Sequence, residues 1–210
     1  MTLVTMVMAQ SRRERKKAET RERIISAAIE IFSQAGIEHA TVDDIAAAAD
    51  VGKGTIYNYF QTKEEIVVAF LVGIEREVQM RATEFASVNG SLQRLLVSFL
   101  AFQLKLKEPH HEFVRVFFAQ MFSRGSSGSP WMRDLQSVID PPLQKFFSIL
   151  QQRDLIRQDI DTQNLVQLFK MLHVGLMTAW VMEGPPWRAT HRLLKEQIRV
   201  LCEGIERREK

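Results

Sequence analysis

The chain has 210 residues, of which 46% are hydrophobic and 25% are charged, an ordinary composition for a soluble globular protein. Six prolines and ten glycines are too few for a fold of short strands and many turns, and the single cysteine, Cys202, excludes an internal disulfide and suits a reducing cytoplasm. A net charge of +3 is compatible with a nucleic-acid partner without establishing one. The apolar residues 1–8 are too few for a signal peptide, and no later segment has about 20 uncharged residues, so we expect no transmembrane helix.

A basic run follows, because Ser11 to Arg23 holds seven Arg or Lys against three Glu. Such a run is usually only a solvated arm, but beside a DNA-reading motif it could bind phosphates or enter a minor groove. We therefore expect residues 1–18 to be a flexible basic arm, with DNA contacts from residues 12–17.

Three short helices are predicted next. The first spans residues 23–35, where apolar residues recur at helical spacing, and Gly36 then fits a left-handed C-cap. The second begins at Thr41, which with Asp44 resembles a capping box. After the turn Asp50-Val51-Gly52, the third spans residues 53–60 and carries apolar residues on one face and hydrogen-bonding groups on the other. Two helices joined by a tight turn indicate a helix-turn-helix.

The stretch from Arg23 to Phe70 resembles the head of the TetR family of repressors. Residues that match the family pattern at fixed spacing are Phe32, Gly36, Thr41, Val42, Ile45, Ala46, Ala49, Val51, Gly54, Thr55, Tyr57, Tyr59, Phe60, Lys63 and Glu64. Asp50 and Gly52 depart from the usual Gly and Ser. The resemblance implies an all-α fold with a helix-turn-helix DNA-binding head at 19–65 and a larger helical ligand-binding and dimerisation domain at 66–210.

The resemblance also implies DNA-contact roles by position. The residues expected at base edges are Lys53, Gly54, Thr55 and Asn58. Lysine can donate to guanine and asparagine suits adenine, while glycine lets the backbone approach closely. The residues expected at phosphates are Thr41, Tyr57, Tyr59 and Lys63. Half-buried packing is the alternative role for the two tyrosines.

In the larger domain, the resemblance implies a cavity for a small-molecule inducer. Aromatic and Met residues are more often plain core, whereas polar groups on apolar helices need a partner or a cavity. The candidate wall residues are Phe99, Gln103, Phe117, Gln120, Met121, Phe147, Phe169, His173 and Trp180. The polar groups Arg115 and Thr178 are further candidates for orienting a ligand. We expect an apolar inducer that is aromatic or bears an acyl chain.

Two apolar stripes near the C-terminus predict long helices. The first holds Leu165, Leu168, Phe169, Leu172, Leu176 and Trp180, and the second holds Leu194, Ile198, Leu201 and Ile205. These are core faces unless a partner covers them. The resemblance implies a homodimer through these two helices, whose heads would read successive major grooves of a palindromic operator on double-stranded DNA. Trp131 to Arg153 is expected to be helical, with a break or a kink at Pro141-Pro142.

The sequence contains no motif for catalysis, so we expect no enzyme and no cofactor. His110-His111-Glu112 is a poor metal site, because adjacent helical side chains diverge by about 100°. One rival function remains: a DNA binder of the same fold that a protein partner controls, or that acts architecturally, without an inducer. A sizeable cavity in the larger domain, present or absent, would separate the two. Repressor or activator stays open.

Overall fold

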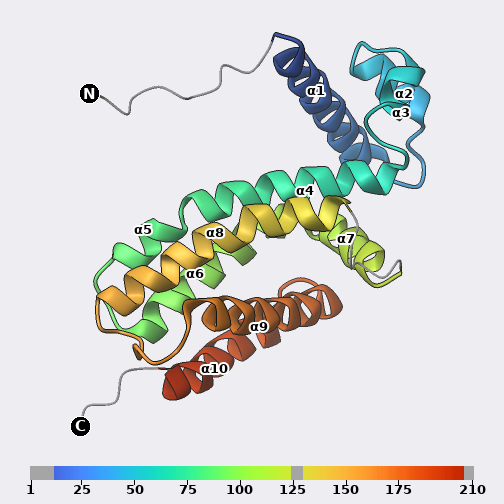
Figure 1. Ribbon diagram of the computed structural model, residues 1–210. Helices are drawn as coiled ribbons and strands as arrows, with labels where there is room; N and C mark the ends of the chain where they lie inside the picture. The colour runs from blue at the N-terminus through green and yellow to red at the C-terminus, as the bar shows by residue number, and fades with distance from the viewer. Residues whose placement is uncertain (1–11, 124–129, 206–210) are drawn as a thin grey trace, which may run out of the picture. The chain divides into compact units, whose positions relative to one another are not determined.

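The computed structural model describes residues 12–123 and 130–205, and all regular elements in these ranges are helices (Figure 1). The chain divides into two compact units. We call the first, up to Phe70, the head, and the second, from Leu71 onward, the larger unit. The boundary therefore falls at Phe70 rather than at the predicted Glu65.

The head contains α1 (Arg12–Ala35), α2 (Val42–Ala48), α3 (Lys53–Tyr57) and the start of α4 (Lys63–Met80). Its core is built from apolar residues of all four helices and the α3–α4 turn: Ile24, Ile25, Ala28, Phe32, Ile45, Ala46, Ile56, Phe60, Ile66 and Val67. The third helix is shorter than predicted and ends at Tyr57. The N–H groups of Tyr59 and Phe60 both donate to the Ile56 carbonyl, which ends the regular helical pattern.

The predicted flexible arm is wrong for residues 12–18, which form the first turns of α1. Ala, Arg, Lys and Glu are strong helix formers, and Arg15 and Glu19 form an ion pair one turn apart at 3.6 Å. Charge alone suggested an arm because it says nothing about backbone preference. The remainder of the predicted arm lies outside the described residues.

Both predicted turns have the expected backbone. Gly36 follows α1 with a φ of 83°, and Asp50 precedes α3 with a φ of 51°. Left-handed backbone is easy for Gly and tolerated by Asp. Gly52 is the N-cap of α3, without a side chain to cap it.

The larger unit continues α4 and adds α5 (Ala82–Ser87), α6 (Leu92–Lys107), the 3-10 turn η1 (Glu108–His110), α7 (His111–Ser123), α8 (Pro130–Gln152), α9 (Thr162–Glu183) and α10 (Arg188–Ile205). The helix pairs α5–α8, α6–α10, α8–α9 and α9–α10 pack together. Their core is aromatic: the Phe99 ring stacks on Phe146 and Phe169 at centroid distances of 5.1 and 6.2 Å.

Of the two alternatives predicted at Pro141-Pro142, the break is wrong, because α8 runs through both prolines. Each proline removes a backbone donor, which disfavours a helix interior. Directly after them, Leu143, Phe146 and Phe147 are buried in the core. This packing holds the segment helical despite the missing donors.

Among the described residues, α9 is the one helix long and apolar enough to cross a membrane by length and composition, where we expected none. Its apolar residues divide between two faces of the helix. Leu165, Phe169, Leu176 and Trp180 are buried, whereas Leu168, Met171, Val174 and Met182 are exposed. The second face accounts for the high hydropathy and is a surface without a cover in a single chain.

Candidate DNA-binding surface and internal cavity

The surface of the head is defined by which face α3 exposes. Ile56 is buried at 2% exposure, while Lys53, Gly54, Tyr57 and Asn58 are exposed. A Cβ added to Gly54 would meet no atom within 4 Å among the described residues, so nothing inside the head requires glycine there. The outward face of α3 therefore carries polar groups and one position with open space in front of its backbone.

The two tyrosines beside α3 differ. Tyr57 is 43% exposed, so a large part of its side chain can meet a partner. Tyr59 is half-buried, with its ring centroid 6.5 Å from that of Phe60. Thr55 is half-buried as well. Packing is thus a larger part of the role of Tyr59 than of Tyr57.

The start of α2 is fixed by a complete capping box. The Asp44 N–H donates to Thr41 Oγ1 at 3.1 Å, and Thr41 donates to the Asp44 carboxylate through both its backbone N–H and its hydroxyl. The hydrogen bond from the Thr41 hydroxyl holds the pKa of Asp44 below its usual value. Because the Thr41 side chain is occupied, an anion here would meet backbone N–H groups of the first turn, which have no partner inside a helix.

Lys53 joins the two helices of the motif. Its Nζ donates to Asp43 Oδ2 at 2.8 Å, and this hydrogen bond raises the pKa of Lys53. Both side chains are exposed. The pair leaves the ammonium at the surface, with two further N–H groups for another acceptor.

Lys63 was predicted to bind phosphate, but the structure gives its ammonium internal partners. Its Nζ donates to the carbonyls of Ile37 at 2.5 Å, Ala40 at 3.0 Å and Glu38 at 3.3 Å. An ammonium has three donors, so the loop between α1 and α2 occupies all of them. Lys63 ties the start of α4 to that loop.

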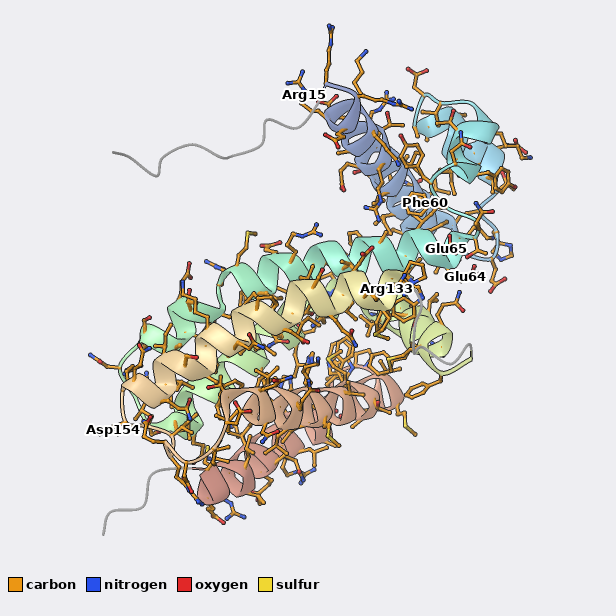
Figure 2. The ribbon with its side chains drawn as sticks, viewed as in Figure 1. Arg15, Phe60, Glu64, Glu65, Arg133 and Asp154 are labelled. Atoms are coloured by element: carbon orange, nitrogen blue, oxygen red, sulfur yellow. The ribbon has the colours of Figure 1, made fainter. Side chains whose placement is uncertain are left out.

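Phe60 lies among the helices of the head, where Figure 2 labels it. It is 4% exposed, and the Arg21 guanidinium lies 5.2 Å from its ring centroid. The start of α1 is more open: Arg15 extends away from the helix, and residues 12–17 are all exposed. Basic side chains on α1 are therefore available to a partner.

The larger unit contains a partly enclosed cavity of about 170 Å³ between α4, α6, α7, α8 and α9. A cavity of about 150 Å³ in another protein holds benzene. The apolar wall is formed by Leu71, Val114, Phe117, Phe118, Met121, Met132, Leu135, Ile139, Leu143, Phe169, Val174 and Met177. Behind the wall, the Trp131 ring meets Phe117 edge-on at a centroid distance of 5.5 Å.

Part of the predicted set of ligand-binding residues lines the cavity. Its wall includes Gln103, Phe117, Met121, Phe169 and His173. The remaining candidates lie elsewhere. Phe99, Phe147 and Trp180 are core residues that are at most 1% exposed, and Gln120 is half-buried on α7 away from the cavity wall. Arg115 is exposed and pairs with Glu112 instead.

One end of the cavity is polar, and most of its groups were missed in the sequence. Lys107 Nζ donates to Glu75 Oε2 at 2.9 Å, and Gln79 Nε2 donates to Glu75 Oε1 at 2.6 Å. Both charged side chains are less than 10% exposed. A signal existed, because Glu75 and Gln79 stand one turn apart in line with the buried Leu71.

The charges at this end balance. Burial raises the pKa of Glu75, but attraction from Lys107 and the hydrogen bonds from Lys107 and Gln79 outweigh it, so that pKa is lowered and Glu75 is ionised. Burial, together with repulsion from Lys107, lowers the pKa of His173 to about 4. The imidazole is therefore neutral near pH 7. The last charged wall residue, Lys170, donates to Asp140 at 2.6 Å.

Several buried polar atoms at the cavity have no hydrogen-bond partner among the described residues. They are Gln79 Oε1, both amide atoms of Gln103, and His173 Nε2. Leaving such atoms unpartnered costs about 1–3 kcal/mol each, so folded proteins usually pair them. The arrangement can therefore offer hydrogen bonds to a guest molecule.

The His110-His111-Glu112 cluster does not converge. His111 Nε2 lies 3.2 Å from Glu112 Oε1, whereas His110 stacks on Phe113 at a centroid distance of 6.2 Å. In the described ranges, no three His, Cys, Asp or Glu side chains gather closely enough to hold a metal ion.

An exposed α3 behind a tight turn, on a three-helix head, defines a helix-turn-helix DNA-binding protein. The sequence pattern of the family "Bacterial regulatory proteins, tetR family" matches residues 24–70. The head of this chain is therefore that of a TetR-family transcriptional regulator. The fold class of the chain is as predicted: all-α, with the helix-turn-helix at the N-terminus.

Two relatives are similar in sequence, and a solved structure shares the fold. SrpR of Pseudomonas putida, an HTH-type transcriptional regulator, is 35% identical over 82 residues, which is 39% of this chain and only 38% of SrpR. BepR of Brucella suis, an HTH-type transcriptional repressor, is 24% identical over 81% of this chain and 84% of its own. FadR of Thermus thermophilus, a TetR-family repressor in complex with lauroyl-CoA, shares the fold, with a TM-score of 0.67 and 22% identity over 90% and 97% of the two chains. These relatives are named as regulators and not as enzymes.

Proposed function

We propose that this protein is a dimeric transcriptional repressor that a small apolar inducer releases from a palindromic operator. One observation carries the proposal: α4 begins in the head and continues into the cavity wall, where it supplies Leu71, Glu75 and Gln79. A ligand in the cavity therefore touches the helix that starts in the DNA-binding head.

For DNA, we assign base contacts to Lys53, Gly54, Thr55 and Asn58. The exposed face of α3 supports this assignment, and the open space before Gly54 suits a close approach of backbone to DNA. Phosphate contacts are assigned to Tyr57, Tyr59 and the start of α2 at Thr41. Lys63 is left to a structural role by its three carbonyl partners.

For dimerisation, we assign the exposed apolar residues of α9 and α10. They are Leu168, Met171, Val174, Met182, Leu193 and Val200. Most residues of the two predicted apolar stripes are buried in the core of the single chain. The surface that we assign to the dimer is therefore a different, neighbouring face of the same two helices. A second copy of this chain would bury these side chains and hold two heads for half-sites roughly 34–36 Å apart.

For control, the ligand must favour a form of the dimer that binds DNA poorly. By linkage, DNA then weakens ligand binding by the same factor, typically about 1–3 kcal/mol. The name of BepR as a repressor and the lauroyl-CoA bound to FadR support ligand-controlled repression. The rival function, control by a protein partner without an inducer, is disfavoured by a cavity whose polar atoms lack partners.

Selection of bound sequences from a random DNA pool, at near-physiological salt, tests the proposal. We expect a palindromic motif, and Lys53→Ala should relax the preference at one position in each half-site. Lys145→Ala, an exposed change on α8, is the control and should leave the motif intact. Recovery of no motif by the folded protein would contradict sequence-specific regulation and favour the partner-controlled alternative.

A further inference from the structure

The cavity specifies its guest more closely than "apolar". This inference rests on the proposed function, because it concerns the inducer of the same cavity. The volume of the cavity limits the size of its guest. About 170 Å³ suits one substituted aromatic ring, since a cavity of about 150 Å³ is filled by benzene. Phenylalanine and methionine side chains form much of the wall, and both make favourable contacts with aromatic rings.

The charged groups at the cavity limit the charge of its guest. Glu75 and Lys107 neutralise each other, Lys170 is paired with Asp140, and His173 is neutral. An anionic guest at Lys107 would bring a second negative charge to a pair that is already neutral, and a cationic guest at Glu75 would bring a second positive charge. Either guest leaves a net buried charge without a partner, which is strongly unfavourable. The site is therefore built for a neutral polar group.

The unpartnered polar atoms at the cavity define which hydrogen bonds a guest would complete. Gln103 is 1% exposed, and neither its Nε2 nor its Oε1 has a partner among the described residues. It therefore presents a donor and an acceptor side by side. Gln79 Oε1 and His173 Nε2 are also unpartnered and line the same cavity. A group that complements Gln103 must itself accept and donate, as an amide does.

We propose that the cavity binds a neutral, single-ring aromatic molecule with one amide-like group, which pairs with the side-chain amide of Gln103. The apolar wall holds the ring, and the pairing orients it. The same pairing removes the cost of two unpartnered buried atoms, so it discriminates against guests that lack the group.

Four probes of nearly equal size test the proposal: benzamide, benzoate, benzamidinium and toluene. Dissociation constants are measured by NMR titration of the full-length protein without DNA. We expect benzamide to bind at least about tenfold more tightly than the two ions. Tighter binding of benzoate or benzamidinium, or binding of none of the four at millimolar concentration, would overturn the proposal.

Gln103→Leu supplies the second arm. It removes two unpartnered polar atoms, so the protein should fold with unchanged or higher Tm. Benzamide should then bind about tenfold more weakly, while toluene binds as well or better. Gln93→Leu, on the exposed face of the same helix, is the matched control and should change neither constant. Unchanged benzamide affinity in Gln103→Leu would overturn the pairing.

A separate measurement keeps this failure distinct from failure of the proposed function. Release of the selected operator is followed by fluorescence anisotropy as each probe is added. Gln103-dependent binding of benzamide without DNA release supports the guest and contradicts induction through this cavity. DNA release by an ion or by toluene, but not by benzamide, supports induction and overturns the guest.

Discussion

The two units of the chain differ in how completely they satisfy their own polar groups. In the head, the Lys63 ammonium is fully engaged by three carbonyls, and the Thr41–Asp44 box closes on itself. All five buried side-chain atoms that lack a hydrogen-bond partner among the described residues lie in the larger unit, and four of them line the cavity. The described part of the head pairs its buried polar side-chain atoms internally, whereas the larger unit leaves buried donors and acceptors unpaired at its cavity.

The difference is also one of range along the chain. In the described part of the head, helix starts and turns are stabilised mainly by neighbours a few residues away, while Lys63 and the Arg21–Phe60 contact join more distant segments. The polar end of the cavity depends on Lys107 meeting Glu75, 32 residues earlier. A buried pair of this kind stabilises little by itself but is costly to break.

The largest effect is expected from breaking that pair. Lys107→Met leaves Glu75 buried without its partner and should lower the free energy of unfolding by about 3–5 kcal/mol. Glu75→Gln combined with Lys107→Met should recover much of this loss. Urea titrations of the three proteins measure it. A single variant as stable as the wild type would show that the pair is not buried in solution.

The next effect concerns acid. The folded-state pKa of His173 is lowered from 6.5 to about 4, so between these values the unfolded chain binds more protons. Stability therefore falls as the pH drops through this window, by at most about 3 kcal/mol for this residue. His173→Gln should make the pH dependence shallower by that amount in urea titrations at pH 7, 5.5 and 4. An unchanged profile in the variant would place the imidazole in contact with solvent.

A smaller effect is expected at Lys63. Lys63→Met removes hydrogen bonds to three carbonyls and should destabilise the protein by about 1.5–3 kcal/mol. If the residue is structural, the salt dependence of DNA binding keeps its slope. A phosphate contact would instead reduce that slope by about 1. Binding measured across a series of salt concentrations decides between the two roles.

The smallest effect on stability is expected at Gly54. Gly54→Ala adds a methyl group that meets nothing in the head and should stabilise α3 by about 0.5–1 kcal/mol. Affinity for the selected DNA should nevertheless fall at least about tenfold, because the methyl occupies the space that DNA needs. Gly73→Ala, which also has open space around its Cβ on α4, is the control and should leave affinity unchanged. Equal affinities for the two variants would remove Gly54 from the interface.

Sequence reasoning succeeded where structure depends on near neighbours. The left-handed backbone at Gly36 and Asp50 and the capping box at Thr41 each involve residues within one or two turns. It failed at the start of α1, where charge was read without helix propensity, and in allowing a helix break at Pro141-Pro142, where packing against distant residues holds the helix.

The cavity could be predicted only in part. Periodicity shows that Phe99 and Phe169 lie on apolar faces, but it does not show which neighbour helix meets each face. In the structure, Phe99 lies in the core and Phe169 lies in the cavity wall. The carbonyl partners of Lys63 were missed for a similar reason, because they lie 23 to 26 residues away.

The edge-on contact between Trp131 and Phe117 gives the protein an optical reporter. The chain has three tryptophans, and two of them, Trp180 and Trp187, are buried and stacked at a centroid distance of 4.7 Å. Trp131 is half-buried and touches a ring that forms the cavity wall. A guest that displaces Phe117 should therefore shift the emission of one indole while the stacked pair holds a constant background, so occupancy can be followed without any label.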